Sequence, residues 1–130
     1  MAKVYYGDEM CRRKLALLLA EMGLPDWLLP FDDINQFGYE NDTGFVWLKR
    51  KPRREQGLEE IEGKIVFYEA EITCYLEPKR IRKLTGVKAK QLFIWISLSE
   101  IHVDKPSAGD ITFKTTSGLS KSFALSEFAA

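Results

Sequence analysis

The chain has 130 residues, of which 45% are hydrophobic and 29% charged, and its 19 basic and 19 acidic side chains cancel to a formal net charge of zero. A chain of this size and composition is expected to form one domain, residues 1–130, and to bury a core without disulfides or metals. Proteins that bind nucleic acid usually carry a basic excess, so the balanced charge argues against a nucleic-acid partner.

The first predicted element is a helix over about residues 8–22. Asp8 stands where an N-cap is expected, and Gly23 followed by Pro25 is typical of a helix end. The apolar side chains of this segment recur at helical spacing and form one stripe: Cys11, Leu15, Leu18, Leu19 and Met22. We therefore expect one N-terminal helix that packs on the rest of the chain through this stripe.

The start of this helix has some features of a secretion signal, because the basic residues 12–14 precede the apolar residues 15–20. The apolar stretch ends at Glu21 and is shorter than the roughly 7–15 residues of a signal core. No stretch has the length and apolarity of a transmembrane helix. We expect a cytoplasmic protein with neither a signal peptide nor a membrane span.

The remainder of the chain, about residues 31–126, has the pattern of a β-rich body. Residues 64–77 alternate apolar and polar side chains, which predicts a long, half-buried strand. A second long run covers residues 91–103, and its alternation changes parity near Ser99, as at a bulge or bend. Shorter strands are expected at residues 34–39, 45–50, 110–115 and 119–125.

Between the two long strands, residues 78–90 are expected to form a basic connector. Pro78 can begin a single helical turn there, and Gly86 can end it. The cations of this connector are Lys79, Arg80, Arg82, Lys83, Lys88 and Lys90. Two interpretations stay open. The cations contact an anionic membrane surface, where each contributes about 1 kcal/mol, or they are solvated at a hairpin end and pair with nearby glutamates.

About seven strands joined mostly by hairpins predict a mainly β fold, an antiparallel β-barrel or sandwich with the N-terminal helix packed on it. The proline-bracketed residues 24–30, which include Trp27, are expected to plug one end of the core. Phe45 and Trp47 share a strand face. A barrel lined with aromatic residues could hold an apolar or amphipathic ligand in its mouth, although filling a core is their commoner use.

The sequence offers few candidates for catalysis. His102 is the only histidine, and strand alternation places it on the same face as Asp104. It is the one candidate base, but no motif links it to a nucleophile, and a local hydrogen bond at a strand end is the simpler interpretation. Cys11 and Cys74 cannot complete a four-ligand metal site with one histidine, so neither a metal nor a cofactor is expected. A disulfide between them is allowed by number alone, and two free, buried thiols are expected.

Several blocks of residues are shared with a known family. In chain order they are Leu24-Pro25, Leu28-Leu29-Pro30, Gly38-Tyr39, Thr43-Gly44-Phe45-Val46-Trp47-Leu48, Lys83-Leu84-Thr85-Gly86-Val87-Lys88-Ala89-Lys90, Gly118 and Phe123. Over about residues 9–128 the chain resembles the plant family called domain of unknown function 538 (DUF538). The resemblance implies a compact β-rich barrel or sandwich with a helix. Many relatives begin with a secretion signal, which we do not expect in this chain, and have proline where this chain has Ala124.

The resemblance implies three kinds of function and carries over no catalytic residue. They are binding of lipid or lipopolysaccharide, hydrolysis of ester-bearing lipids or pigments, and a role in stress responses. We expect non-enzymatic binding of an apolar or amphipathic small molecule or lipid, with contacts from the connector cations and Trp47. The alternatives are an esterase-like hydrolase that uses His102 and a protein-interaction or stress-response module whose outward aromatics meet a partner or a second copy. The sequence leaves the oligomeric state open.

Overall fold

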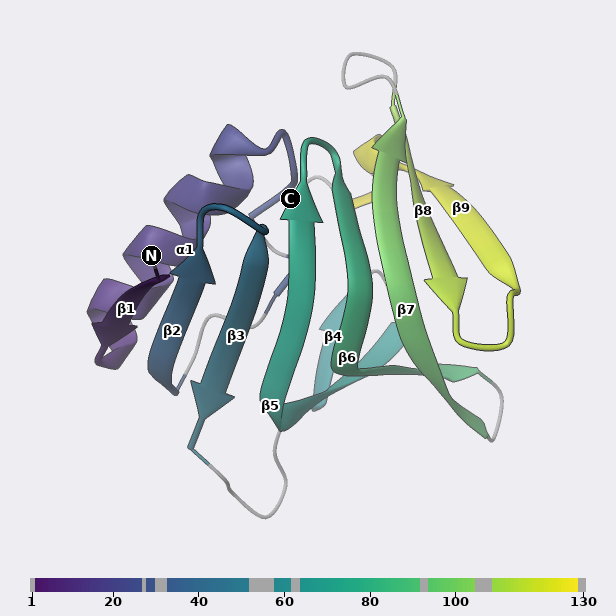
Figure 1. Ribbon diagram of the computed structural model, residues 1–130. Helices are drawn as coiled ribbons and strands as arrows, with labels where there is room; N and C mark the ends of the chain where they lie inside the picture. The colour runs from purple at the N-terminus through teal and green to yellow at the C-terminus, as the bar shows by residue number, and fades with distance from the viewer. Residues whose placement is uncertain are drawn as a thin grey trace.

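The computed structural model describes residues 2–26, 28–29, 33–51, 58–61, 64–91, 94–104 and 109–128. In these residues nine strands form one antiparallel sheet, and one α-helix near the N-terminus packs on it (Figure 1). The strands are paired in the order β1-β2-β3-β5-β6-β7-β8-β9, and β4 pairs with β5 off this path. The expected mainly β, antiparallel fold with an N-terminal helix is confirmed. The sheet is open rather than closed into a barrel, since β1 and β9 stand at the ends of the order.

The elements follow one another in a simple order along the chain. They are β1 (Ala2–Tyr6), α1 (Asp8–Glu21), β2 (Ile34–Glu40), β3 (Phe45–Arg50), β4 (Leu58–Ile61), β5 (Lys64–Glu77), β6 (Arg80–Gln91), β7 (Ile94–Asp104), β8 (Asp110–Thr115), β9 (Ser120–Ala124) and the 3₁₀ helix η1 (Leu125–Phe128). In the described part of the chain, no helix is long and apolar enough to span a membrane. The strands β1, β4 and β6 were not expected from the sequence.

The helix α1 lies where the apolar stripe predicted it, but Asp8 does not cap it. Gly7 occupies the N-cap position with a φ of 88° and makes no side-chain cap. The Asp8 carboxylate accepts a hydrogen bond from the Ile34 backbone N–H at 3.1 Å, which fastens the helix to β2. At the other end, Gly23 has a φ of 71° and the Leu24 N–H donates to the Leu19 carbonyl at 2.9 Å, which closes the last turn.

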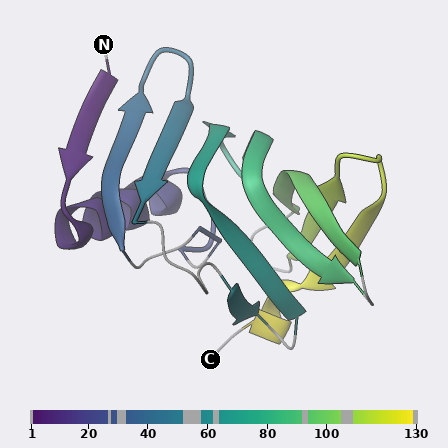
Figure 2. The same cartoon turned by 90° about the horizontal axis from the view of Figure 1, so that it is seen from below.

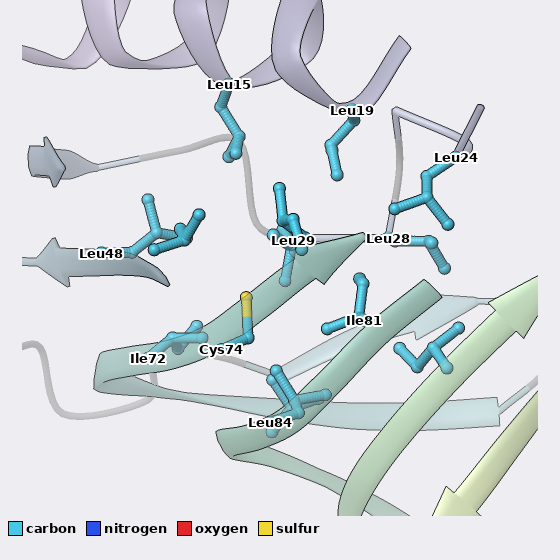
Figure 3. Close-up of a cluster of buried hydrophobic side chains, with 14 of the residues drawn as sticks. Leu15, Leu19, Leu24, Leu28, Leu29, Leu48, Ile72, Cys74, Ile81 and Leu84 are labelled. Carbon is cyan, nitrogen blue, oxygen red and sulfur yellow. The ribbon is translucent and has the colours of Figure 1, made fainter. Parts of the chain in front are cut away.

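The core lies between α1 and the inner face of the sheet, the face that carries the buried strand residues (Figure 3). Leu28 and Leu29, from the segment expected to plug the core, are buried there, whereas Trp27 lies outside the described residues. The helix and this segment face buried residues of β3, β5 and β6: Leu48, Ile72, Cys74, Ile81 and Leu84. Burial of this apolar surface is the main stabilising term of the fold.

The two longest strands of the sheet, β5 and β6, bend sharply around Gly86. The pairing of β5 with β6 passes from Tyr68↔Val87 to Thr73↔Thr85, so residues 69–72 of β5 lie opposite Gly86 alone. Gly86 has a φ of +83°, and a Cβ there would lie 2.3 Å from the Glu71 carbonyl oxygen. Only glycine fits this position. Figures 1 and 2 show the resulting curvature of the sheet.

The prediction that residues 78–90 form a connector with a single helical turn is wrong. Residues 80–91 form the strand β6, which lies between the two long strands predicted to be neighbours. The turn consists of Pro78 and Lys79, and Lys79 has a φ of 63°. The inward residues Ile81, Leu84 and Val87 recur every three positions, which imitates a helical stripe. This spacing arises in a strand because bulges fall between them. The parity change expected near Ser99 is confirmed as a register shift between β7 and β8.

We predict that Gly86→Ala lowers the free energy of unfolding by about 3 kcal/mol or more, because it adds a backbone clash to left-handed strain. Gly118→Ala is the matched control. Gly118 also has a positive φ, +92°, but its Cβ would meet nothing within 4 Å. This control should lose only about 1 kcal/mol. Urea denaturation followed by circular dichroism measures both, and equal losses would contradict the proposed contact.

The two cysteines are free and buried, as expected. Burial raises the pKa of Cys74 from 9.0 to about 12 and also raises the pKa of Cys11. The thiolate is the reactive form of cysteine. We therefore predict that neither thiol reacts with Ellman's reagent in the native protein near neutral pH, and that both react in urea.

The raised pKa of Cys74 also predicts a pH dependence of stability. The unfolded thiol ionises near its ordinary value of 9.0 and the folded thiol near 12, so its stabilising effect is complete below 9.0 and is lost as the pH rises toward 12. Urea midpoints should therefore fall less steeply above pH 9.0 in Cys74→Ala than in the wild type. Parallel pH profiles would show that this thiol does not ionise on unfolding.

Candidate functional site

Three aromatic side chains meet on the outer face of the sheet, the face opposite α1 and the core. Phe45 and Trp47 come from β3, and Tyr75 comes from β5 directly opposite Phe45. The ring centroids of Phe45 and Trp47 are 5.9 Å apart, and those of Phe45 and Tyr75 are 5.2 Å apart. All three side chains are half-buried. Outward faces of antiparallel sheets are usually polar, so this aromatic platform (Phe45, Trp47 and Tyr75) is a departure from the ordinary pattern.

A glycine beneath the aromatic platform fixes its shape. Gly38 of β2 pairs with Trp47 of β3. A Cβ built on Gly38 would lie 2.0, 2.1 and 2.4 Å from the ring atoms Cζ2, Cε2 and Cη2 of Trp47. Three adjacent ring atoms at such similar distances mean that the indole lies face-down on the glycine backbone. Because Gly38 has no side chain, the ring can lie flat against the sheet at this position.

One predicted cation stands directly over the platform. The Lys83 ammonium lies 5.7 Å from the ring centroid of Tyr75, within the range of a cation–π contact. Lys83 has a φ of 50°, so it sits at a bulge of β6 in a conformation that non-glycine residues rarely adopt. Beside it, Arg82 forms an ion pair with Glu77. The neighbourhood of Tyr75 therefore carries one cation, Lys83, that is engaged with a ring rather than with a carboxylate.

The other predicted cations do not gather into one patch. Arg80 begins β6, and its Nε lies 3.8 Å from the Glu100 carboxylate. Lys79 is in the preceding turn, where its N–H donates to the Met22 carbonyl at 2.6 Å and its side chain is exposed. Lys88 and Lys90 lie beyond the bend, near the end of β6. The structure thus separates Lys79 to Lys83 from Lys88 and Lys90.

His102 lies on β7 between two carboxylates of the same strand. Its Nδ1 is 3.6 Å from Glu100 Oε2, and its Nε2 is 3.6 Å from Asp104 Oδ2. Nδ1 is buried and makes no hydrogen bond to any described residue. A histidine that activates a hydroxyl nucleophile directs one ring nitrogen at that hydroxyl and the other at a carboxylate. Here both nitrogens face carboxylates, so the local geometry does not form a nucleophile–base pair.

The comparison with protein families places the chain. A family described as "Protein of unknown function, DUF538" matches residues 15–129. The chain belongs to the DUF538 family. The matched region runs from within α1 to η1 and so contains the aromatic platform, the strand β6 and His102. A search of curated proteins and a search of solved structures each found no match.

The sequence of this DUF538 domain revealed only part of the platform. The shared parity of Phe45 and Trp47 indicated an aromatic face, whereas Tyr75 looked like one member of a polar strand face with Glu71 and Glu77. The meeting of Tyr75 with Phe45 depends on β3 pairing with β5. No local sequence pattern shows that pairing. The alternation of residues 64–77 does place Tyr75 outward, and that was the available signal.

We predict that Gly38→Ala in the DUF538 domain lowers the free energy of unfolding by about 1–3 kcal/mol, because the added methyl group meets the Trp47 ring. In a Trp47→Leu background the same change should cost clearly less, since the leucine can move aside. A double-mutant cycle by urea denaturation measures the coupling. Additive losses would show that the indole does not rest on Gly38.

Proposed function

We propose that this DUF538 domain is a non-enzymatic binding protein that holds an amphipathic small molecule against the aromatic platform. The supporting observation is the cluster of Phe45, Trp47 and Tyr75 on the outer face of the sheet, where the Phe45 ring is tilted by 31° and 53° to the other two and Lys83 lies over the Tyr75 ring. A planar or apolar body can stack on the rings, and an anionic group can pair with Lys83. The open sheet forms no barrel interior, so the site proposed is on the surface rather than in a barrel mouth.

The chemistry of the platform indicates the class of ligand. Aromatic faces favour other rings and apolar chains by dispersion and by burial of apolar area. The carboxylate of Glu77 is paired with Arg82, which leaves the Lys83 ammonium as the donor closest to Tyr75 for an anionic group. A lipid with a charged head group, or an aromatic acid, has both parts. An uncharged sugar would lack the pairing with Lys83, and a bare cation would be repelled by the Lys83 ammonium.

The first test is native mass spectrometry of protein purified without detergent, compared with the denatured mass. Extra mass that is lost on denaturation is the expected result, and it identifies the ligand. Where the protein carries none, titration with the probe anilinonaphthalene sulfonate, which joins an aromatic body to an anionic group, should show saturable binding.

The variants decide whether the platform is the site. Trp47→Leu should weaken ligand or probe binding at least about tenfold, the effect of losing about 1.4 kcal/mol of stacking and burial. Lys83→Gln should weaken binding of the anionic probe and leave the fold intact. Trp95→Leu, which removes an exposed tryptophan outside the platform, should bind normally. A Trp47→Leu protein that is folded by circular dichroism and binds as well as the wild type would overturn the proposal. A dimer in the native spectrum with no ligand would favour the platform as a protein interface instead.

A further inference from the structure

The end of the hairpin formed by β6 and β7 exposes two large apolar side chains. Ile94 is 65% exposed and Trp95 is 42% exposed, although both belong to a regular strand. In Figure 1 this end of the hairpin projects at the lower right, away from α1 and the N-terminal strands. Apolar side chains at a projecting tip do not contribute to the core, so their place in the molecule needs another explanation.

Trp95 is held in place by neighbours on the outer face rather than by the core. Its ring lies 6.1 Å from the ring of Phe67 in an edge-to-face arrangement. The Lys90 ammonium lies 6.0 Å from its ring centroid. The register places Lys90 directly opposite Trp95, and Lys88 opposite Ser97. Alternation therefore puts Lys88, Lys90 and Trp95 on one face of the hairpin.

The two lysines of this hairpin differ from the arginines at the other end of β6. Arg80 and Arg82 each approach a carboxylate, of Glu100 and Glu77 respectively. In the part of the chain that the structure describes, neither Lys88 nor Lys90 has an ion-pair partner. Their charge is therefore available to an external anion.

An exposed aliphatic side chain, an exposed tryptophan and two unpaired lysines at one tip match the chemistry of a bilayer surface. Tryptophan prefers the boundary between lipid chains and head groups. Lysine places its ammonium at lipid phosphates while its stem covers apolar surface. Each lysine near an anionic bilayer strengthens binding about fivefold. The backbone at Lys90 and Gln91 pairs with Trp95 and Ile94, so the two strands remain paired with each other up to this end of the hairpin.

We propose that the tip of the β6–β7 hairpin (Lys88, Lys90, Ile94 and Trp95) docks the protein on the surface of an anionic lipid bilayer. The hairpin enters end-on, so that Ile94 and Trp95, which point to opposite faces of it, both reach the head-group region, and the two lysines contact lipid phosphates. This docking site lies beyond the Gly86 bend from the aromatic platform and does not depend on the small-molecule site proposed there. The occupant is the bilayer surface itself, and the protein lies on it without crossing it.

The test is co-sedimentation of the purified full chain with large unilamellar vesicles. One set is phosphatidylcholine alone, and the other is phosphatidylcholine with phosphatidylserine at about three to one, a composition with an anionic surface. We expect binding to the anionic vesicles that weakens as salt is raised, and much weaker binding to the neutral vesicles. Equal binding to both vesicles, or none to either, would overturn the proposal.

Two variants and two controls locate the contact. Lys88→Gln/Lys90→Gln should weaken binding to anionic vesicles about twentyfold and remove most of its salt dependence. Ile94→Ser/Trp95→Ser should weaken it at least about tenfold. The matched charge control is Lys3→Gln/Lys51→Gln, at two exposed lysines away from the tip, and the matched apolar control is Leu17→Ser/Leu119→Ser, at two exposed leucines outside both the tip and the aromatic platform. Both controls should bind vesicles like the wild type.

Either control losing binding as strongly as the hairpin variants would overturn the assignment to this tip. The same preparations should be weighed by light scattering. If the wild type is a dimer that the hairpin variants dissociate, and vesicles are not bound, the patch is an interface between copies and the membrane proposal is wrong. All substituted positions are exposed or half-buried, so circular dichroism should show an unchanged fold.

Discussion

The close approach of two backbones at Gly86 is the constraint on which the rest of the sheet depends. The Glu71 carbonyl oxygen lies 2.3 Å from where a Cβ of residue 86 would be, so the absence of that Cβ allows β5 to bend across β6. The bend divides β5 between two neighbours: residues 71–75 pair with β3, and residues 64–67 pair with β4. It also keeps Lys83 and the aromatic platform apart from the hairpin tip at Lys90. One residue without a side chain thus decides both the curvature of the sheet and the separation of its two outer surfaces.

The two faces of the sheet are stabilised by different interactions. The inner face is mostly aliphatic, with Phe37 and Tyr68 as buried aromatic residues, and it is covered by α1 and by Leu28 and Leu29, so it gains its stability from burial of apolar area. The outer face combines ring contacts, as between Phe45 and Tyr75, with ion pairs, as between Arg82 and Glu77. Contacts of this second kind leave polar and aromatic groups within reach of solvent. The outer face therefore has groups with which a ligand can interact, whereas the apolar surface of the inner face is buried in the core.

Local periodicity revealed α1 and β5 from the sequence almost to the residue, because each has one long face on which most of the described side chains are buried. It failed for β6, where Lys83 and Gly86 at bulges shift the inward positions to every third residue and so imitate a helix. It also missed β1 and β4, which are too short for alternation to be distinctive.

The surfaces were harder to predict than the elements. The platform requires Tyr75 to lie opposite Phe45, and that contact skips β4 in the strand order. The hairpin tip requires Ile94 to be exposed, although it shares a parity with the buried Leu98. Both depend on pairings between distant segments and on where the sheet ends. These are properties of the assembled chain that no single stretch of residues contains.

The turn at Lys79 has a consequence for how the chain folds as it is synthesised. Its N–H donates a hydrogen bond to the carbonyl of Met22 just after α1, and its own carbonyl accepts one from the N–H of Val103 in β7. The leucines of α1 likewise face Ile81 of β6, which is made much later. The helix therefore leaves the ribosome before the partners of its apolar stripe in β3, β5 and β6 have been made. Contacts between residues so far apart in the sequence form slowly during folding. A chaperone therefore has its main opportunity to bind the apolar stripe of α1 before β6 emerges.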